Sequence, residues 1–259
     1  NSDVAPEGAL DIAFFDAIGF GTVVDSLSAI KTLVFEQKRL SMKELLEALD
    51  CNFEGKEDIQ ALLQGAPSFG NGDLEVDTLG RMLEKSALDF TARYAGKNGV
   101  QPLEIRTTSV TANVPHGKFV GATPNGRKAW MPLSDGSSPS HGSDRNGPTA
   151  VLLSQYQSTN WNAANRACRL LNMKMAPKTV EGEEGTKKLV DLIRAFINLR
   201  VWHLQMNIIN RETLVAAQKD PQKYKNLVVR IAGYSAYFVD LSPDLQNDLI
   251  DRTEQENCD

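Results

Sequence analysis

The chain has 259 residues, enough for one large domain or two small ones, and its 41% hydrophobic and 24% charged residues are ordinary for a soluble globular protein. Its net charge of -5 argues against a general nucleic-acid binder, which would carry a basic excess. No apolar run approaches the ~18 residues that would suggest a membrane span.

The start of the chain and its cysteines bear on how the chain is made and on the compartment in which it works. The sequence begins at Asn1 without an initiator Met or the basic and apolar regions of a signal peptide, so we expect a processed chain or a piece of a longer one. The cysteines are odd in number and far apart, which excludes a disulfide framework and fits a reducing cytoplasm: Cys51, Cys168 and Cys258. No metal site is expected, because there is no CxxC pair and the histidines stand alone: His116, His141 and His203.

The first part of the chain, residues 1–103, is predicted to be mainly helical. Apolar residues recur at helical spacing in 22–35. Ser41 and Glu44 have the spacing of a capping box at the start of a second helix. Two more helices are expected, over 56–64 and 73–95.

The composition changes at about residue 104. Residues 106–114 are β-prone and uncharged after Arg106, which predicts a shielded strand. The long segment 115–149 is crowded with Gly, Pro, Ser, Asn and Asp, but it also contains Trp130 and Leu133. Loops of this length are functional or disordered, and the apolar residues favour an ordered, functional loop.

Helices alternate with strands in the second half, which predicts an α/β architecture. Helices are expected over 186–196 and 212–219, and strands over 201–209 and 227–231. A helix is also expected around Cys168. A last helix should begin at Ser242-Pro243, with proline at its first position.

Gly233 follows the 227–231 strand and lies in Arg230-Ile-Ala-Gly-Tyr-Ser-Ala236, away from any Asn-Gly or Pro-Gly turn signal. Taken alone, such a glycine indicates a bulge or a tight bend at the end of a strand. The residues around it indicate more than that. The run Leu227–Leu241 resembles the C-terminal signature of glycyl radical enzymes, and 246–254 continues the resemblance.

Further blocks agree with this family in its order along the chain. They are Gly121-Ala-Thr-Pro-Asn-Gly-Arg127, the segment from Pro132-Leu-Ser-Asp-Gly136 to Asn146-Gly-Pro-Thr149, and Gln205-Met-Asn207. The resemblance implies the C-terminal portion of a ten-stranded α/β barrel with surrounding helices and a central glycyl radical loop. Residues 104–259 would then hold barrel strands and the glycine radical domain.

The chemistry explains why the residue must be glycine. Loss of a Cα hydrogen leaves a radical delocalised between the amide nitrogen and the carbonyl, which requires a planar centre that a side chain would crowd. The family resemblance implies an activating enzyme, with a 4Fe-4S cluster and S-adenosylmethionine, that installs this radical under anaerobic conditions. No bound cofactor is expected in the chain itself.

The resemblance also implies supporting residues. The expected supports of the radical loop are Arg230, Tyr234, Gln205 and Asn207. Candidates for substrate contacts are Thr111 and Asn113, by alternation along the 106–114 strand, and Arg127 and Asp135 on the 115–149 loop. For the last two, bracing of the radical loop is the better interpretation. Phe14, Phe15 and Phe20 suit core packing better than a substrate wall.

The family passes the radical from glycine to a cysteine, and none of the three cysteines here has the matching context. No thiyl cysteine is therefore assigned, and the remainder of the catalytic subunit is expected to supply it. Small accessory subunits are possible partners.

Within the family, three phrases look closest to benzylsuccinate and alkylsuccinate synthases: Trp202–Asn210, Trp130–Gly142 and Ser242–Asn247. This favours a carbon–carbon lyase that adds a hydrocarbon to fumarate. A diol dehydratase, a C–N lyase or an arylacetate decarboxylase is the main alternative. A radical-carrying accessory subunit without its own catalytic site is another, and a non-catalytic α/β binding module would require the match at Gly233 to be accidental.

Overall fold

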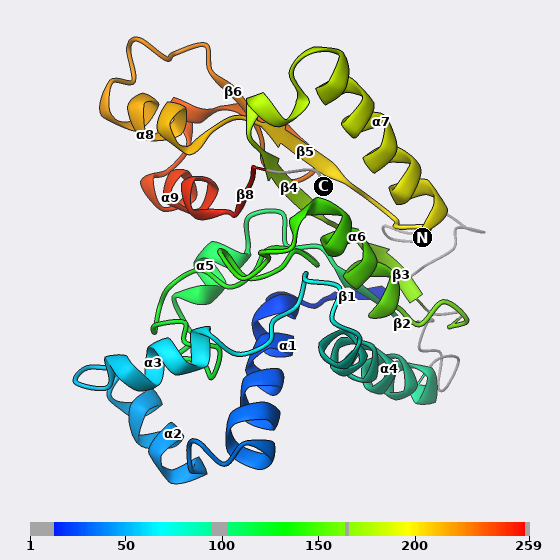
Figure 1. The fold of residues 1–259 in the computed structure, drawn as a ribbon, viewed down its shortest axis with the longest axis vertical. Helices are drawn as coiled ribbons and strands as arrows, with labels where there is room; N and C mark the ends of the chain where they lie inside the picture. The colour runs from blue at the N-terminus through cyan, green and yellow to red at the C-terminus, as the bar shows by residue number, and fades with distance from the viewer. Residues whose placement is uncertain (1–12, 95–102, 164–165, 257–259) are drawn as a thin grey trace, which may run out of the picture.

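The computed structural model describes residues 13–94, 103–163 and 166–256. Helices α1 to α4 gather at one end of the molecule, and helices α7 to α9 lie at the other, around a second sheet (Figure 1). The chain crosses between the two ends several times, so that residues far apart in sequence meet in the middle.

The helical end is formed almost entirely by the first hundred residues. Its helices are α1 (Phe20–Ala29), the π-helix η1 (Ile30–Glu36), α2 (Met42–Asp50), α3 (Glu57–Gln64) and α4 (Leu74–Tyr94). The expected capping box is present: the Glu44 N–H donates to Ser41 Oγ at 3.2 Å, and the Ser41 N–H donates to Glu44 Oε2 at 2.9 Å. The helix expected over 22–35 is instead an α-helix that continues as a π-helix, as the hydrogen bond from Gln37 N–H to Thr32 O shows.

Two parallel sheets and one antiparallel hairpin make up the strands. The first sheet has the order β1 (Ala13–Asp16), β2 (Leu103–Thr107), β3 (Arg166–Arg169), and the second has the order β5 (Gln205–Ile208), β4 (Asn172–Met175), β8 (Glu254–Gln255). The hairpin pairs β6 (Val228–Arg230) with β7 (Ser235–Tyr237). Because β1 pairs with β2, the mainly helical part and the remainder of the chain share a sheet.

The remaining helices lie in the middle of the molecule and around the second sheet and the hairpin (Figure 1). They are α5 (Asn113–Gly117), α6 (Gly147–Gln157), η2 (Pro177–Val180), α7 (Gly182–Asn198), α8 (Arg211–Lys219), η3 (Phe238–Asp240) and α9 (Pro243–Asp251). Asn210 caps α8 by accepting the Thr213 N–H at 2.9 Å. Pro243 lies at the first position of α9 as expected, whereas the Ser242 side chain makes no capping hydrogen bond.

Two expected elements are wrong. The strand predicted over 106–114 ends at Thr107, and the chain then turns into α5. Val110 has a φ of 51°, and the Ala112 N–H bonds to Ser109 O at 2.6 Å, so tertiary contacts override the β propensity of the segment. Cys168 was expected in a helix but lies in β3, a strand that pairs in parallel with β2.

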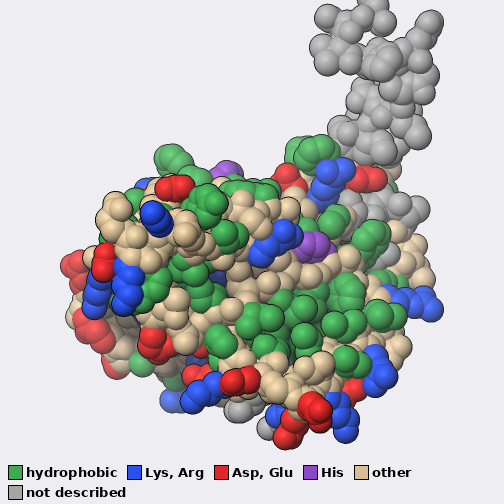
Figure 2. All heavy atoms as spheres, turned by 90° about the horizontal axis from the view of Figure 1, so that it is seen from above, with side chains coloured by type: hydrophobic (Ala, Val, Ile, Leu, Met, Phe, Trp, Pro, Cys, Tyr) green, Lys and Arg blue, Asp and Glu red, His purple; other side chains and the backbone are tan. Residues whose placement is uncertain are grey.

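The apolar interior is divided into clusters that fix the elements around the hairpin. One cluster joins α8 and α9 to the hairpin through Leu214, Leu249, Val229, Ile231 and Phe238. Figure 2 shows hydrophobic side chains gathered over part of the face seen from above in Figure 1. Exposed apolar patches are typical of interaction sites. No helix within the described residues is long and apolar enough to cross a membrane.

Candidate active site

Gly233 lies at the turn of the β6–β7 hairpin. The hairpin is closed by the hydrogen bond from Ile231 N–H to Tyr234 O at 2.9 Å. Gly233 has a φ of +85°, in the left-handed region that favours glycine. It is exposed, and a Cβ built on it would meet no heavy atom within 4 Å. The Cα of Gly233 is therefore open to approach by a reacting group.

Strand β5 holds this turn through two of the residues expected from the sequence. Gln205 Oε1 accepts the Gly233 N–H at 2.7 Å. Asn207 Nδ2 donates to Arg230 O at 2.6 Å, and Asn207 Oδ1 accepts the Arg230 N–H at 2.8 Å. Residues two apart on a strand face the same side, so the two amides reach the hairpin together.

The other two expected supports contribute less through their side chains. Arg230 Nη1 donates to Ser235 Oγ at 3.3 Å, across the hairpin. Tyr234 is 43% exposed, and its carbonyl closes the turn. Both residues therefore shape the hairpin chiefly through their backbone.

Two residues that were not singled out from the sequence extend the contacts of the turn. Asn172 is in register with Gln205 on the neighbouring parallel strand, and its Oδ1 accepts from Gln205 Nε2 at 2.9 Å. Arg252, which follows α9, donates from Nη1 to Ile231 O at 3.2 Å. The strand register and the packing of α9 bring them here; Arg252 lies in the 246–254 block of the resemblance, but no local pattern indicated its contact with the turn.

Asp135 lies behind the hairpin and not in an open substrate site. It is 1% exposed, it accepts from the Asn172 amide, and its Oδ2 lies 3.5 Å from Arg252 Nη2. This position suits a brace of the hairpin.

Arg127 braces its own loop. Its Nη1 donates to Met131 O at 2.6 Å, and its Nη2 donates to Gly121 O at 2.6 Å and to Val120 O at 3.2 Å. Partial burial lowers the pKa of the guanidinium. With its donors committed to backbone carbonyls, Arg127 organises the turn rather than the hairpin.

Thr111 and Asn113 do not alternate along a barrel strand, because the strand ends before them. Thr111 lies in the turn that precedes α5, and its carbonyl accepts the Val114 N–H. Asn113 is fully buried, with Nδ2 donating to Asp248 Oδ1 at 2.9 Å and to Leu133 O at 3.3 Å. The alternation that predicted substrate contacts for these two residues is therefore absent.

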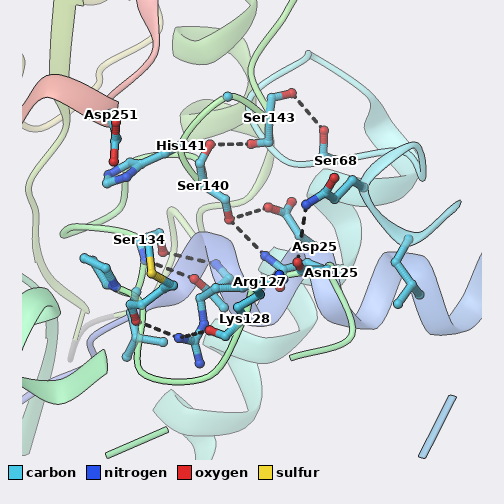
Figure 3. Close-up of a pocket in the computed structure, with 18 of the residues that line it drawn as sticks. Asp25, Ser68, Asn125, Arg127, Lys128, Ser134, Ser140, His141, Ser143 and Asp251 are labelled. Atoms are coloured by element: carbon cyan, nitrogen blue, oxygen red, sulfur yellow. Dashed lines mark hydrogen bonds between the residues drawn. The ribbon is translucent and has the colours of Figure 1, made fainter. Parts of the chain in front are cut away.

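A large cavity lies apart from the hairpin, and Gly233 is not among the residues that line it. It measures about 630 Å³ and lies between α1, α3, α9 and the 125–145 loop. Figure 3 shows Ser140 directed at Asp25 and at Asn125 on the cavity wall, and the His141 Nε2 lies 3.6 Å from Asp248 Oδ1. Burial raises the pKa of Asp25 to about 7, against the hydrogen bonds from Ser140 and from the Phe69 N–H.

The cysteines and phenylalanines lie on other elements. Cys51 ends α2, with its Sγ near the carbonyl oxygens of neighbouring residues, and burial raises the pKa of the Cys168 thiol. Cys258 lies outside the described residues. Phe20 packs edge-on against Phe69 in the core, whereas Phe14 and Phe15 on β1 are 50% and 57% exposed, so core packing is wrong for these two. Among the described residues, no group of three or more His, Cys, Asp or Glu forms a metal site.

The hairpin glycine and the parallel sheets that support it agree with what family comparisons find. The glycine radical family model matches residues 133–239, and the pyruvate formate lyase-like model matches residues 3–117. The chain belongs to the glycyl radical enzyme family.

Individual members of the family show which proteins the chain is similar to. The chain is 60% identical over 248 residues to an isethionate sulfite-lyase of Nitratidesulfovibrio vulgaris, covering 96% of this chain and 30% of the relative. It is 40% identical to a trans-4-hydroxy-L-proline dehydratase of Clostridioides difficile, covering 93% of this chain and 30% of the relative. Among solved structures, the glycerol-bound B12-independent glycerol dehydratase from Clostridium butyricum matches with a TM-score of 0.87 at 39% identity, over 95% of this chain and 31% of that one. The α/β barrel-type fold expected from the sequence is confirmed by these neighbours.

The chain spans about 30% of the length of the curated relatives it matches. These relatives correct the expected reaction: isethionate sulfite-lyases and dehydratases, not fumarate-adding synthases, are the similar proteins. The three phrases that suggested a synthase lie in the framework, around β5, in the 130–142 loop and at the start of α9.

Proposed function

We propose that this chain is the glycine-radical portion of a lyase that stores a radical at Gly233 and releases sulfite from a 2-hydroxyalkanesulfonate of the isethionate type. The single observation that carries the proposal is the presentation of Gly233. Its Cα is unobstructed at the turn, while its N–H is held by Gln205 at 2.7 Å. The identity of 56–60% to isethionate sulfite-lyases, against 43% or less to the dehydratases, supports this substrate class.

The reaction balances without an external oxidant. Loss of a hydrogen atom from the carbon that bears the hydroxyl weakens the neighbouring C–S bond. The sulfonate group then leaves as sulfite with the electron pair of the C–S bond while the hydroxyl loses its proton, and return of the hydrogen atom to the other carbon gives an aldehyde. The hydroxyl carbon is oxidised and the other carbon is reduced, so the radical is regenerated at the end of each turnover.

Within this scheme the chain holds the radical and the remainder of the catalytic subunit supplies the cysteine that reacts with substrate. The Cys51 thiol bonds to the carbonyl oxygens of Ala48 and Glu54, and Cys168 lies in β3 of the first sheet. An activating enzyme with an iron–sulfur cluster and S-adenosylmethionine would generate the radical. Residues 104–259 would act as the radical-bearing unit, and residues 1–103 would belong to the surrounding catalytic domain.

The test uses the complete catalytic subunit, activated anaerobically by its activating enzyme. We expect a glycyl radical signal in electron paramagnetic resonance and release of sulfite from isethionate. The matched variant Gly233→Ala should give neither, because a side chain would crowd the planar centre. A subunit that carries the radical at Gly233 but releases no sulfite would contradict the assigned reaction and leave the radical site standing.

A dehydratase is the second candidate, favoured by the solved structures. Dehydratases of glycerol and of trans-4-hydroxy-L-proline match this fold at TM-scores of 0.87. Incubating the activated subunit with glycerol, hydroxyproline and isethionate in parallel separates the candidates. Water loss from either alcohol at a rate above that of sulfite release would favour the dehydratase.

A further inference from the structure

A closed ring of polar groups surrounds the base of the Gly233 turn. One half runs through the second sheet. The Gly233 N–H donates to Gln205 Oε1 at 2.7 Å, and Gln205 Nε2 donates to Asn172 Oδ1 at 2.9 Å. Asn172 Nδ2 then donates to Asp135 Oδ2. The turn is thereby tied, through two in-register strands, to the 133–139 segment.

The other half of the ring runs through Arg252. Its Nη2 lies 3.5 Å from the same oxygen of Asp135 that accepts from Asn172. Its Nη1 donates to Ile231 O at 3.2 Å. Ile231 is two residues before Gly233, so the ring returns to the turn from the opposite side.

The ring is buried and electrostatically tight at Arg252. This side chain is 7% exposed and lies between Asp135 and Asp248, each 1% exposed. The Arg252 Nη2 to Asp248 Oδ2 distance is 3.0 Å. Burial lowers the pKa of Arg252, but the two carboxylates raise it by more, so the guanidinium keeps its charge. The planar guanidinium group of Arg252 therefore has a fixed orientation.

Packing holds the turn on one side only. Ile231 and Ala232 before Gly233 are buried, whereas Gly233 has open surroundings and the two residues after it are exposed. The position of the Gly233 Cα is therefore set by the buried residues before it together with the groups at the two ends of the ring. Arg252 lies beyond both spans that the family models match.

We propose that Arg252 and Asn172 are positioning residues for Gly233, which hold the peptides from Ile231 to Gly233 in the place from which the Cα exchanges hydrogen with the reactive cysteine. The inference rests on the proposed function. In that step the cysteine S–H bond breaks and the Gly233 Cα–H bond forms, so the radical moves to sulfur. Such a transfer needs the reacting atoms within ~3.5 Å, and a misplacement of about 1 Å can cost two orders of magnitude in rate.

The test compares Arg252→Gln and Asn172→Ala with Arg211→Gln in the complete, anaerobically activated subunit. Arg211 pairs with Asp251 at the same end of α9 but lies outside the ring and is about half exposed, so its loss is a matched control. Turnover is divided by the radical content from spin counting. We expect turnover per radical to fall about tenfold or more in both ring variants, with KM unchanged. The control should stay within about twofold of wild type.

Wild-type turnover per radical in a folded Asn172→Ala variant would overturn the inference. A rise in KM with turnover per radical unchanged would overturn it as well, since that pattern belongs to substrate binding. Asn172 is only partly buried, so this variant decides the matter even where Arg252→Gln does not fold. Failure of the proposed function is seen separately, as the absence of a radical at Gly233 in the wild-type subunit.

Discussion

Gly233 combines a positive φ with open space around its Cα, as Gly55, Gly142 and Gly182 also do. A φ of +85° favours glycine, and the open space around the Cα leaves room for a reaction partner. A structural turn needs only the first. The hydrogen bond from the Gly233 N–H to Gln205 adds a fixed orientation to this otherwise unpacked position. A glycine that only closed a hairpin would not need an amide from another sheet.

Exposure of the activated protein to air should cut the chain at Gly233. Oxygen adds to a carbon-centred radical, and the peroxyl product breaks the backbone at that residue. Mass spectrometry of the denatured chain should give an N-terminal fragment whose new end lies at residues 232–233. An intact chain that carries a confirmed radical at another residue would rule out Gly233, and Gly233→Ala should remain uncut.

At the scale of the element, short-range signals fix where helices begin. The reciprocal hydrogen bonds between Ser41 and Glu44 satisfy two N–H groups that α2 would otherwise leave unpaired. The elements that pack around the hairpin depend instead on contacts with residues far away in the sequence. Lys174 on β4, for example, donates to Ile250 O at 2.9 Å and so satisfies the end of α9, and its burial lowers the pKa of its ammonium to about 8.

Replacing Ser41 by alanine should lower the free energy of unfolding by about 1 kcal/mol, because the capping hydrogen bond to the Glu44 N–H is lost. Chemical denaturation monitored by circular dichroism measures this. Ser41→Asp retains an acceptor at the cap and should recover most of the loss. Equal destabilisation by the two variants would argue against a capping contribution.

At the scale of the whole molecule, buried carboxyls join the helical end to the loop and the second sheet. Asp25 on α1 accepts from Ser140 Oγ at 2.5 Å and from the Phe69 N–H at 2.7 Å. Asp144 accepts from Thr253 and, at 2.6 Å, from Gln255 on β8. Burial raises the pKa of Asp144 to about 6. The packing of the two ends therefore depends on carboxyls that change protonation near neutral pH.

The free energy of unfolding should fall as the pH rises from about 4 to 7. Asp25 has a pKa of about 7 when folded and 3.8 as its ordinary value, so the folded state binds more protons across this window. Stability present below the lower value is lost by the upper one, on the order of a few kcal/mol. Urea unfolding at pH 4.5 and 7.5 measures the difference.

Asp25→Asn is the matched variant for this prediction. The amide keeps an acceptor for Phe69 and cannot ionise, so the pH dependence should become shallower. Ser140→Ala should have the opposite effect, because the Ser140 hydrogen bond lowers the pKa of Asp25. An unchanged slope in Asp25→Asn would show that other carboxyls account for the pH dependence.

The local sequence determined the helices α2, α3, α4, α7 and α8 to within a few residues, and it marked Gly233 with its amide partners Gln205 and Asn207. These features depend on caps, on periodicity and on the alternation of side chains along one strand, which neighbouring residues specify. The tertiary structure decided the rest. It ended β2 at Thr107, where packing overrode β propensity, and it brought Asn172 and Arg252 to the hairpin beside Asp135, which the sequence had already indicated as a brace. Those contacts depend on the register between parallel strands and on the position at which α9 packs, and no local pattern encodes either of them.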